Sequence, residues 1–498
     1  MRLIFTLFAL WIAAAVWAQH EEHGTCGYVG KSPWLDWYQR NSGLFDGPEN
    51  GDTTWLYVPV TLHIVGTNSG SGYFSLDQAL RAMCRLNQQF ASSYIRFYLM
   101  PGDAVRYHNN SNWYTHDFSG GAQMLQTVVP PLRNRLNVFV VADPAGNCGY
   151  AWFDAVVMRN SCSGPDNTTW AHEVGHHFSL GHTFMGWEGF TWNYGIPAPP
   201  NVSGIPVERA DGSNCYVAGD GFCDTPPDYL NYRWACDTTG RSTVPQIDPT
   251  GVSFRSDASL IMSYAFDRCA SRFSREQIAA MRANLRTEHK AYLQLTNPLP
   301  ELPDNAQVEL ISPLDSTQVV QFNHIELKWK KVPGARYYVV EVSRSPDFVS
   351  RFYSETLIDA DHVTITKTLP NNWTLFWRVR AYSDWDVCQP FDQAQIGSFR
   401  TQNLSATNEL ERQVAILLKP NPTSVGQPAQ FMAQVESAMD VQLAIHDATG
   451  RLCWQQPVRL YPGENTIALP VERLEAGAYL LAMRNELGVA IRRFVVAD

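Results

Sequence analysis

The sequence has little charge and no block of basic residues. Charged residues make up 17% of the chain, and 38 Lys and Arg stand against 48 Asp and Glu, which gives a net charge of -10. A chain without a basic surface has no strong attraction for nucleic acid or for anionic membranes. We therefore expect neither of them as a partner.

Long hydrophobic runs are also missing, except at the N-terminus. Residues 3–17 are apolar, but this run is shorter than the roughly 20 residues that a helix needs to span a bilayer. Val16 and Ala18 place small residues where signal peptidase cuts, and polar residues follow. We predict a cleaved signal peptide over residues 1–18, with an uncleaved anchor as the alternative, and no transmembrane segment.

Glycine and proline are too few for a low-complexity chain, and cysteine is too rare for a small disulfide scaffold. There are 33 Gly, 30 Pro and 10 Cys, while 45% of the residues are hydrophobic, so the chain should fold around hydrophobic cores. At roughly 150 residues per domain, the length predicts about three domains. We place them at residues 53–294, 307–401 and 413–498, after a pro-segment at 19–52.

The first of these domains has a mixed α/β pattern. Residues 57–65, 95–100 and 136–142 are apolar runs of strand length, and apolar residues recur with helical spacing over 76–90. Residues 274–277 read SREQ, a capping box that predicts the start of a helix. The predicted fold class is an α/β (α+β) domain followed by two all-β sandwich domains.

The two later domains alternate apolar and polar residues, as the strands of β-sandwiches do. A proline-containing linker at residues 297–304 precedes the first of them. Its segments 325–334 and 373–382 resemble a fibronectin type III module. Another small sandwich is the alternative, because alternation predicts the fold class and not the family.

The last domain contains four short sequence motifs: KPNP at residues 419–422, GENTI at 463–467, GAY at 477–479 and RRFVV at 492–496. Together they resemble the C-terminal sorting domain that Bacteroidetes use for type IX secretion. The resemblance implies a protein exported by a Gram-negative bacterium, secreted or held at the cell surface, with the secretion machinery as a partner. A carbohydrate-binding or structural sandwich is the alternative.

Residues 172–182 read HEVGHHFSLGH and carry the most specific signal in the chain. On a helix, His172 and His176 lie four residues apart and therefore on one face, where two imidazoles can bind one metal ion. His182 is the candidate third ligand, provided that the chain leaves the helix before it. Glu173 is placed to activate a metal-bound water without being a ligand itself. A helix with surface histidines is the alternative.

This pattern is that of the metzincin clan of zinc peptidases. Three further stretches resemble one branch, the pappalysin or cytophagalysin family: HTF at residues 182–184, GDGFCDTP at 219–226 and IMSY at 261–264. The resemblance implies that Met262 packs beneath the metal site. It also implies that the phenol of Tyr264 helps to stabilise the tetrahedral intermediate.

The chain departs from the clan at Ser179. Members usually have Gly three residues after the second His, where the helix turns sharply. Ser incurs a steric cost in the left-handed conformation that Gly avoids. A turn that failed here would leave His182 off the metal and the domain inactive.

The loop at residues 219–226 offers carboxylate and hydroxyl oxygens, the ligands that calcium prefers. The family resemblance implies that Asp220 and Thr225 bind calcium, with Asp224 nearby. A solvated acidic loop without a metal is the alternative.

Export would permit disulfides among the ten Cys. The family resemblance pairs Cys236 with Cys269, which leaves Cys215 with Cys223, although four cysteines permit three connectivities. Cys26, in the pro-segment, is a candidate thiolate that blocks the zinc and keeps the enzyme latent. The alternative for this residue is a disulfide with Cys84, Cys148 or Cys162.

The sequence thus predicts a secreted zinc endopeptidase that hydrolyses peptide bonds in proteins or peptides. Zinc would be bound by the three histidines, Glu173 would activate the zinc-bound water, and Tyr264 would help to stabilise the oxyanion. A thermolysin-like peptidase would need a Glu ligand on a later helix, and His182 argues against it. The alternative from another class is an inert metzincin-like adhesin or binding protein, for which Ser179 is the support.

Overall fold

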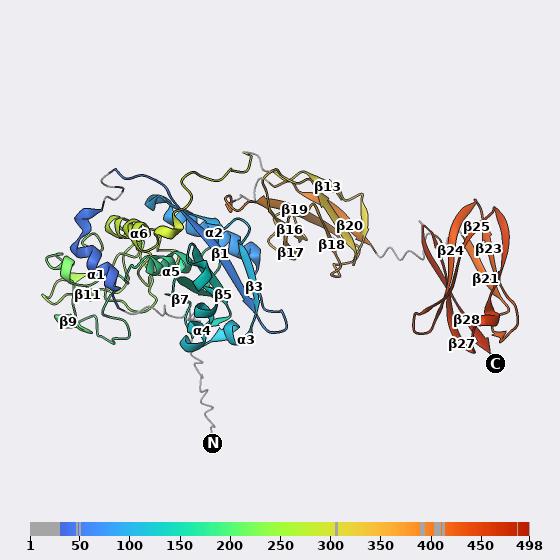
Figure 1. Cartoon of the computed structure of the whole chain (residues 1–498), viewed down its shortest axis with the longest axis horizontal. Helices are drawn as coiled ribbons and strands as arrows, with labels where there is room; N and C mark the ends of the chain where they lie inside the picture. The colour runs from blue at the N-terminus through green and yellow to red at the C-terminus, as the bar shows by residue number, and fades with distance from the viewer. Residues whose placement is uncertain are drawn as a thin grey trace, which may run out of the picture.

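The computed structural model describes residues 30–45, 48, 51–303, 307–388, 394–402, 410, 414–485 and 487–497. Cys26 and the predicted signal peptide lie outside these residues. Figure 1 shows an α/β domain followed by two β-sandwiches, which confirms the predicted fold class. In the described part of the chain, no helix is long and apolar enough to cross a membrane.

A six-stranded sheet forms the centre of the α/β domain. Its order is β2, β1, β5, β8, β7, and β3 pairs with the second half of β1. All pairs are parallel except that of β7 with β8, which makes β7 an antiparallel edge strand. The strands are β1 (Leu56–Gly66), β2 (Ile95–Leu99), β3 (Val105–Asn109), β5 (Leu136–Val141), β7 (Gly149–Trp152) and β8 (Ala155–Arg159).

Helices pack on both faces of this sheet, as its nearly continuous apolar strands require. On one face, α2 (Leu76–Phe90), α5 (Thr169–His177) and α6 (Arg275–Thr287) share one hydrophobic core with β1. On the other face lies α4 (Phe118–Val128). The predicted capping box starts α6, because Ser274 and Gln277 each accept a backbone hydrogen bond from the other.

The helix α1 (Pro33–Arg40) comes from the predicted pro-segment and packs against α6. Leu35 and Tyr38 are buried in the core of the α/β domain. Trp34 Nε1 donates a hydrogen bond to Thr287 Oγ1 at 3.0 Å. This part of the segment is therefore built into the domain.

Residues 178–274 are mostly irregular and are held by cross-links and an aromatic cluster that includes Trp187, Tyr229 and Trp234. The disulfides Cys215–Cys223 and Cys236–Cys269 are both present, which confirms the pairing that the family resemblance implied. The short elements of the α/β domain are α3 (Ser111–Tyr114), β4 (Thr115–His116), β6 (Asp143–Pro144), β9 (Asn201–Val202), β10 (Ile205–Pro206), β11 (Gln246–Ile247) and β12 (Ser253–Phe254).

The middle sandwich packs a three-stranded sheet on a five-stranded one around the buried Trp329 and Trp377. The smaller sheet contains β13 (Leu310–Ser312), β15 (Ile325–Trp329) and β18 (His362–Ile365). The larger one contains β14 (Val319–Gln321), β20 (Gly397–Gln402), β19 (Thr374–Tyr382), β16 (Tyr337–Ser343) and β17 (Arg351–Ile358).

The disulfide Cys84–Cys388 joins this middle sandwich to α2 of the α/β domain. Cys148 pairs with Cys162. The alternative disulfides of Cys26 with these residues are therefore wrong, because each of them already has a partner. Its latency role lies outside the described residues.

The C-terminal sandwich has the same construction and a core of its own. One sheet contains β21 (Val414–Lys419), β23 (Ala429–Val435) and β26 (Gly463–Leu469). The other contains β22 (Thr423–Ser424), β28 (Gly488–Ala497), β27 (Gly477–Asn485), β24 (Met439–Asp447) and β25 (Leu452–Leu460).

Candidate metal centre

Three histidine side chains converge at the end of α5. The Nε2 atom of His176 lies 3.1 Å from Nε2 of His172 and 3.1 Å from Nε2 of His182. Among the described residues, these three form the one group of three or more His, Cys, Asp and Glu side chains placed to hold a metal ion. The structure thus brings together the three ligands predicted from the sequence.

A tight turn after α5 carries His182 back to the helix. Ser179 has a φ of 71°, so it occupies the left-handed position that Gly usually takes after a helix. Its N–H donates to His176 O at 2.8 Å, and Leu180 N–H donates to Gly175 O at 3.0 Å, which is the Schellman pattern. Asn284 Nδ2 of α6 donates to Ser179 Oγ at 3.1 Å. The turn that Ser179 put in question is therefore formed.

The Nδ1 atom of each histidine donates a hydrogen bond to an oxygen. His172 donates to Ile261 O at 2.8 Å, His176 donates to Leu180 O at 2.8 Å, and His182 donates to a carboxylate oxygen of Glu188 at 3.0 Å. These bonds leave a lone pair on every Nε2 and hold each ring in place, as partners of metal-binding histidines do.

Burial keeps the three imidazoles neutral. It lowers the pKa of His172 to about 4, and it lowers the pKa of His176 and of His182 well below the ordinary value of histidine. The neighbouring imidazoles reinforce the effect at His176 and His182, because two protonated rings would repel each other. Neutral imidazole is the form that binds metal.

Glu173 is fully buried next to the first histidine, on the side of α5 that faces β7. Gly149, the first residue of β7, lies against the Glu173 side chain.

His177, which directly follows His176, has no metal role in the sequence pattern. It is also buried, and its Nε2 lies 3.1 Å from the hydroxyl oxygen of Tyr292. His176 and His177 are thus adjacent in α5, but His176 faces the other metal-site histidines and His177 faces Tyr292.

Met262 and Tyr264 both lie close to the histidine group. A Cβ built at Gly175 of α5 would lie 2.5 Å from Met262 Sδ, so Met262 packs directly beneath the helix. The ring of Tyr264 is 5.1 Å from that of His182 and 5.8 Å from that of His172, centroid to centroid. The phenol is therefore close to the position that the three Nε2 atoms surround.

The predicted calcium residues lie in one loop but bond mainly to the protein. Asp220 is fully buried and accepts hydrogen bonds from Phe222 N at 3.0 Å and Thr225 Oγ1 at 2.9 Å. Asp224 instead accepts from Glu276 N at the start of α6. Burial raises the pKa of Asp220 to about 8 and that of the nearby Glu208 to about 9. Calcium binding at this loop remains a prediction.

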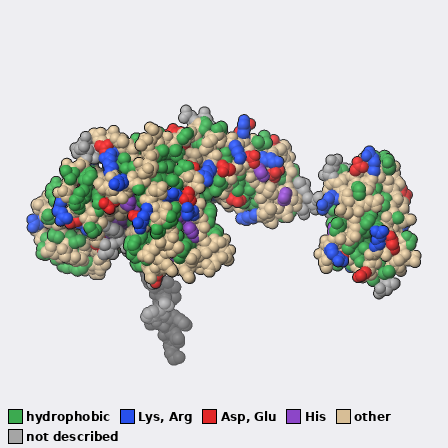
Figure 2. All heavy atoms as spheres, in the orientation of Figure 1, with side chains coloured by type: hydrophobic (Ala, Val, Ile, Leu, Met, Phe, Trp, Pro, Cys, Tyr) green, Lys and Arg blue, Asp and Glu red, His purple; other side chains and the backbone are tan. Residues whose placement is uncertain are grey.

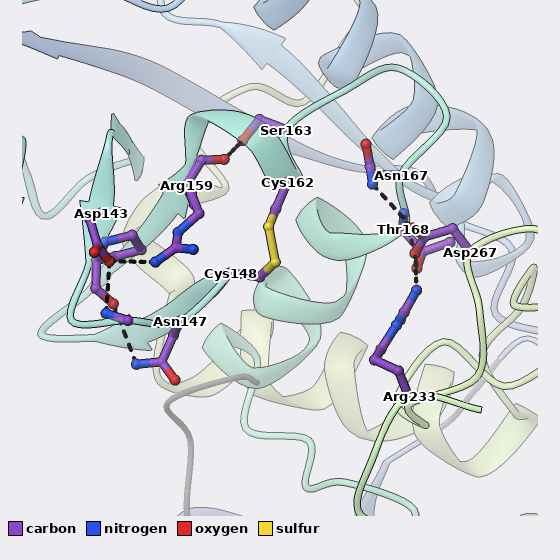
Figure 3. Close-up of a disulfide and its surroundings, with 12 residues drawn as sticks. Asp143, Asn147, Cys148, Arg159, Cys162, Ser163, Asn167, Thr168, Arg233 and Asp267 are labelled. Carbon is purple, nitrogen blue, oxygen red and sulfur yellow. Dashed lines mark hydrogen bonds and ion pairs between the residues drawn. A yellow bond between two sulfur atoms is a disulfide. The ribbon is translucent and has the colours of Figure 1, made fainter. Parts of the chain in front are cut away.

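The segment that leads into α5 is fixed at both ends, as Figure 3 shows. At its start, the disulfide Cys148–Cys162 ties the residue before β7 to the turn after β8. At the first turn of α5, Thr168 Oγ1 donates to Asp267 Oδ1 at 2.7 Å, and Arg233 forms an ion pair with the same oxygen at 3.3 Å.

Sequence reasoning did not assign roles to Glu188, Gly149 or Asp267. Glu188 lies six residues beyond His182, inside an irregular segment, and no spacing rule relates it to the metal site. Gly149 and Asp267 reach α5 from distant strands and loops. Only the folded chain reveals these neighbours.

The C-terminal sandwich can be compared with known families. Residues 420–497 match the family model described as the secretion system C-terminal sorting domain. This chain carries a secretion sorting domain. The sorting domain marks a protein that Bacteroidetes export by type IX secretion, which confirms the predicted secreted or cell-surface location.

The chain is also similar to extracellular metalloproteases. One from Pyricularia oryzae is 30% identical over an alignment of 195 residues, and the match covers 34% of this chain and 64% of that protein. One from Colletotrichum graminicola is 24% identical over an alignment of 255 residues, and the match covers 45% of this chain and 87% of that protein. The match therefore spans a little less than two thirds of the first relative and most of the second.

Among solved structures, a promirolysin mutant from Tannerella forsythia is similar at 20% identity and a TM-score of 0.37. The match covers 55% of this chain and 100% of that chain.

Figure 2 shows how charge is distributed on one face of the molecule. On this face, the described Lys and Arg residues are scattered among Asp and Glu and form no concentrated basic patch.

Proposed function

We propose that the α/β domain is a zinc-dependent endopeptidase that hydrolyses peptide bonds in proteins. The observation that carries the proposal is the group of three histidine Nε2 atoms beside the buried Glu173. The similarity to extracellular metalloproteases supports it. Secretion through the sorting domain would bring such an enzyme to protein substrates outside the cell.

The donor set fits zinc. Three neutral imidazoles with hydrogen-bonded Nδ1 atoms are a common ligand set for catalytic zinc, and they leave a fourth position open. A bound zinc ion would supply a Lewis acid that lowers the pKa of water and polarises a carbonyl group. A structural zinc site would instead be closed by a fourth protein ligand.

The surrounding side chains supply the remaining chemistry. The Glu173 carboxylate would take a proton from the attacking water and deliver one to the leaving amine. The phenol of Tyr264 would donate a hydrogen bond to the oxyanion of the tetrahedral intermediate. Neither residue needs to bind the metal for these roles.

The edge strand β7 suits an extended peptide substrate. It lies at the end of the sheet, contacts α5, and pairs through one side with β8. A peptide can add to the free side of such a strand through main-chain hydrogen bonds. This placement favours a protein substrate over a small molecule.

The proposal is tested by purifying the secreted protein and measuring its metal content and its cleavage of casein. We expect one zinc per chain, activity that a chelator removes and zinc restores, and no measurable cleavage by Glu173→Ala. His176→Ala should lose zinc, whereas His177→Asn, the matched control on the same helix, should keep it. Cleavage that survives both chelation and Glu173→Ala contradicts the mechanism. Zinc bound without any cleavage would favour the inert adhesin.

We also propose that calcium binds at the loop of Asp220, Asp224 and Thr225. A cation there would offset the cost of burying the carboxylates of Asp220 and Glu208, whose pKa values burial raises. Calcium should raise the melting temperature of the protein, and magnesium at the same concentration should raise it less. Asp220→Asn should remove the calcium effect. An unchanged melting temperature in calcium contradicts this site.

A further inference from the structure

The missing side chain of Gly149 makes room for Glu173. A Cβ atom built at Gly149 would lie 2.8 Å from Glu173 Cγ and 3.0 Å from its Oε1. These separations are shorter than van der Waals contact, so any larger residue would displace one of the two groups. The φ of Gly149 is outside the left-handed region, and the backbone therefore does not require Gly here. The three atoms nearest to that Cβ all belong to the Glu173 side chain, which therefore accounts for the requirement.

A disulfide holds Gly149 at this distance. Its neighbour Cys148 is bonded to Cys162, which lies in the short helix Asn160–Cys162 ahead of α5. Figure 3 shows this bond linking the strand β7 to the segment that enters the helix. Beside it, Arg159 Nη2 pairs with Asp143 Oδ1 and Ser163 Oγ donates to Arg159 O at 2.8 Å. The residue before β7 is thus bonded covalently to the segment that leads into α5, the helix that carries Glu173.

We infer that Gly149 and the Cys148–Cys162 disulfide position the Glu173 carboxylate for proton transfer. The absence of a side chain at Gly149 lets the Glu173 carboxylate approach β7 closely, and the disulfide keeps β7 from moving away. Proton transfer needs its base within hydrogen-bond reach of the water, and small displacements cost large factors in rate. The inference rests on the proposed peptidase function, but its steric part can be measured without activity.

The first experiment compares Gly149→Ala with Gly195→Ala. Gly195 is an exposed glycine whose added Cβ would meet only the side-chain oxygen of Asn193, at 3.3 Å. We expect Gly149→Ala to lower kcat by about 100-fold, to change KM by less than twofold, and to leave one zinc per chain. Gly195→Ala should change none of these. An unchanged kcat in Gly149→Ala overturns the inference.

The second experiment measures melting temperatures in a double-mutant cycle. Gly149→Ala should lower the melting temperature when Glu173 is present and have little effect in the Glu173→Ala background, where the space is free. Equal decreases in both backgrounds overturn the steric contact. If the wild-type protein cleaves no substrate but the cycle shows this coupling, the peptidase function fails while the packing of Glu173 against Gly149 stands.

The third experiment removes disulfides. The double variant Cys148→Ser, Cys162→Ser should lower kcat at least tenfold at a temperature where it remains folded, with zinc still bound. The matched control Cys84→Ser, Cys388→Ser removes a disulfide far from Gly149 and should keep kcat within twofold. Equal kcat values for the two double variants overturn the role of the Cys148–Cys162 bond.

Discussion

The two β-sandwiches share an architecture and differ in what surrounds them. The middle sandwich contributes Tyr337, Val339 and Tyr382 to the hydrophobic core of the α/β domain and is joined to it by Cys84–Cys388. The sorting domain has a separate core. Figure 2 shows the same contrast, with the first two bodies in contact and the third standing apart. The attachment surface, and not the sandwich fold, decides whether a sandwich shares a core with the α/β domain.

Buried charges strengthen the first attachment. Glu341 of β16 is fully buried and forms ion pairs with Arg351 at 2.7 Å, with Arg378 at 2.7 Å and with Arg81 of α2 at 3.3 Å. Arg380 of β19 reaches Asp77 of α2 at 3.3 Å. Because Glu341, Arg380 and Asp77 are buried, their charges depend on these partners, and the pairs Glu341–Arg81 and Arg380–Asp77 cross the boundary between the domains.

Removing the central carboxylate should have the largest effect. Glu341→Ala leaves the buried Arg378 without its anion and removes the ion pairs to Arg81 and Arg351, so it should destabilise the α/β domain and middle sandwich together by about 3–5 kcal/mol. Calorimetry on the whole protein would show their shared transition moving down while the transition of the sorting domain stays in place. Glu326→Gln, an exposed ion-pair residue of β15, should change stability by less than about 1 kcal/mol. If the α/β domain and the middle sandwich instead melted in separate transitions, they would not form one cooperative unit.

Removing the cross-link should have the next largest effect. Cys84→Ser with Cys388→Ser should cost about 2–4 kcal/mol of unfolding free energy, because the bond closes a long loop of the unfolded chain. Urea unfolding would measure the change. Cys453→Ser in the sorting domain, where the cysteine is free, should leave stability unchanged. A large loss of unfolding free energy in Cys453→Ser would show that the sorting domain also depends on its cysteine, which contradicts the contrast between the two sandwiches.

Raising the pH should weaken the catalytic unit alone. Burial raises the pKa of Asp220 to about 8 and of Glu208 to about 9, whereas an unfolded carboxyl titrates near 4. Between pH 7 and 9 the folded state therefore holds protons that the unfolded state has lost, and stability falls as the pH rises. In calcium-free buffer, the melting temperature of the first transition should fall and that of the sorting domain should stay level. Asp220→Asn should reduce the fall.

Deleting the sorting domain should have the smallest effect on the catalytic unit. A chain ending at Gln402 should keep the melting temperature of the first transition and the kcat of the whole secreted protein, because the two cores are separate. The same deletion should abolish export in the native host. A lower kcat or melting temperature would show that the sorting domain contacts the enzyme.

Local patterns of the sequence were sufficient for most of the framework. Helical spacing predicted α2, the capping box predicted the start of α6, and the spacing of His172 and His176 predicted one metal-binding face. These predictions succeed because each pattern and its consequence lie within a few residues. The pairing Cys84–Cys388 spans 304 residues and could not be predicted, because sequence alone does not fix disulfide connectivity.

Ser179 shows where a local rule needed the fold. Its side chain disfavours the left-handed conformation, and the sequence therefore put the turn to His182 in question. In the structure, the backbone hydrogen bonds of the turn and the hydrogen bond from Asn284 to the Ser179 hydroxyl stabilise that conformation. Asn284 lies 105 residues further along the chain, so no local pattern could have supplied it.

The placement of the disulfides determines what a single cut in the chain would release. A protease that cut the linker before the middle sandwich would leave two fragments still joined through Cys84 and Cys388. A cut between Gln402 and Val414 crosses none of the four disulfides of the described chain. One broken peptide bond there would free the α/β domain and the middle sandwich from the sorting domain without any reductant. The two junctions thus differ in whether a single cut separates the flanking domains.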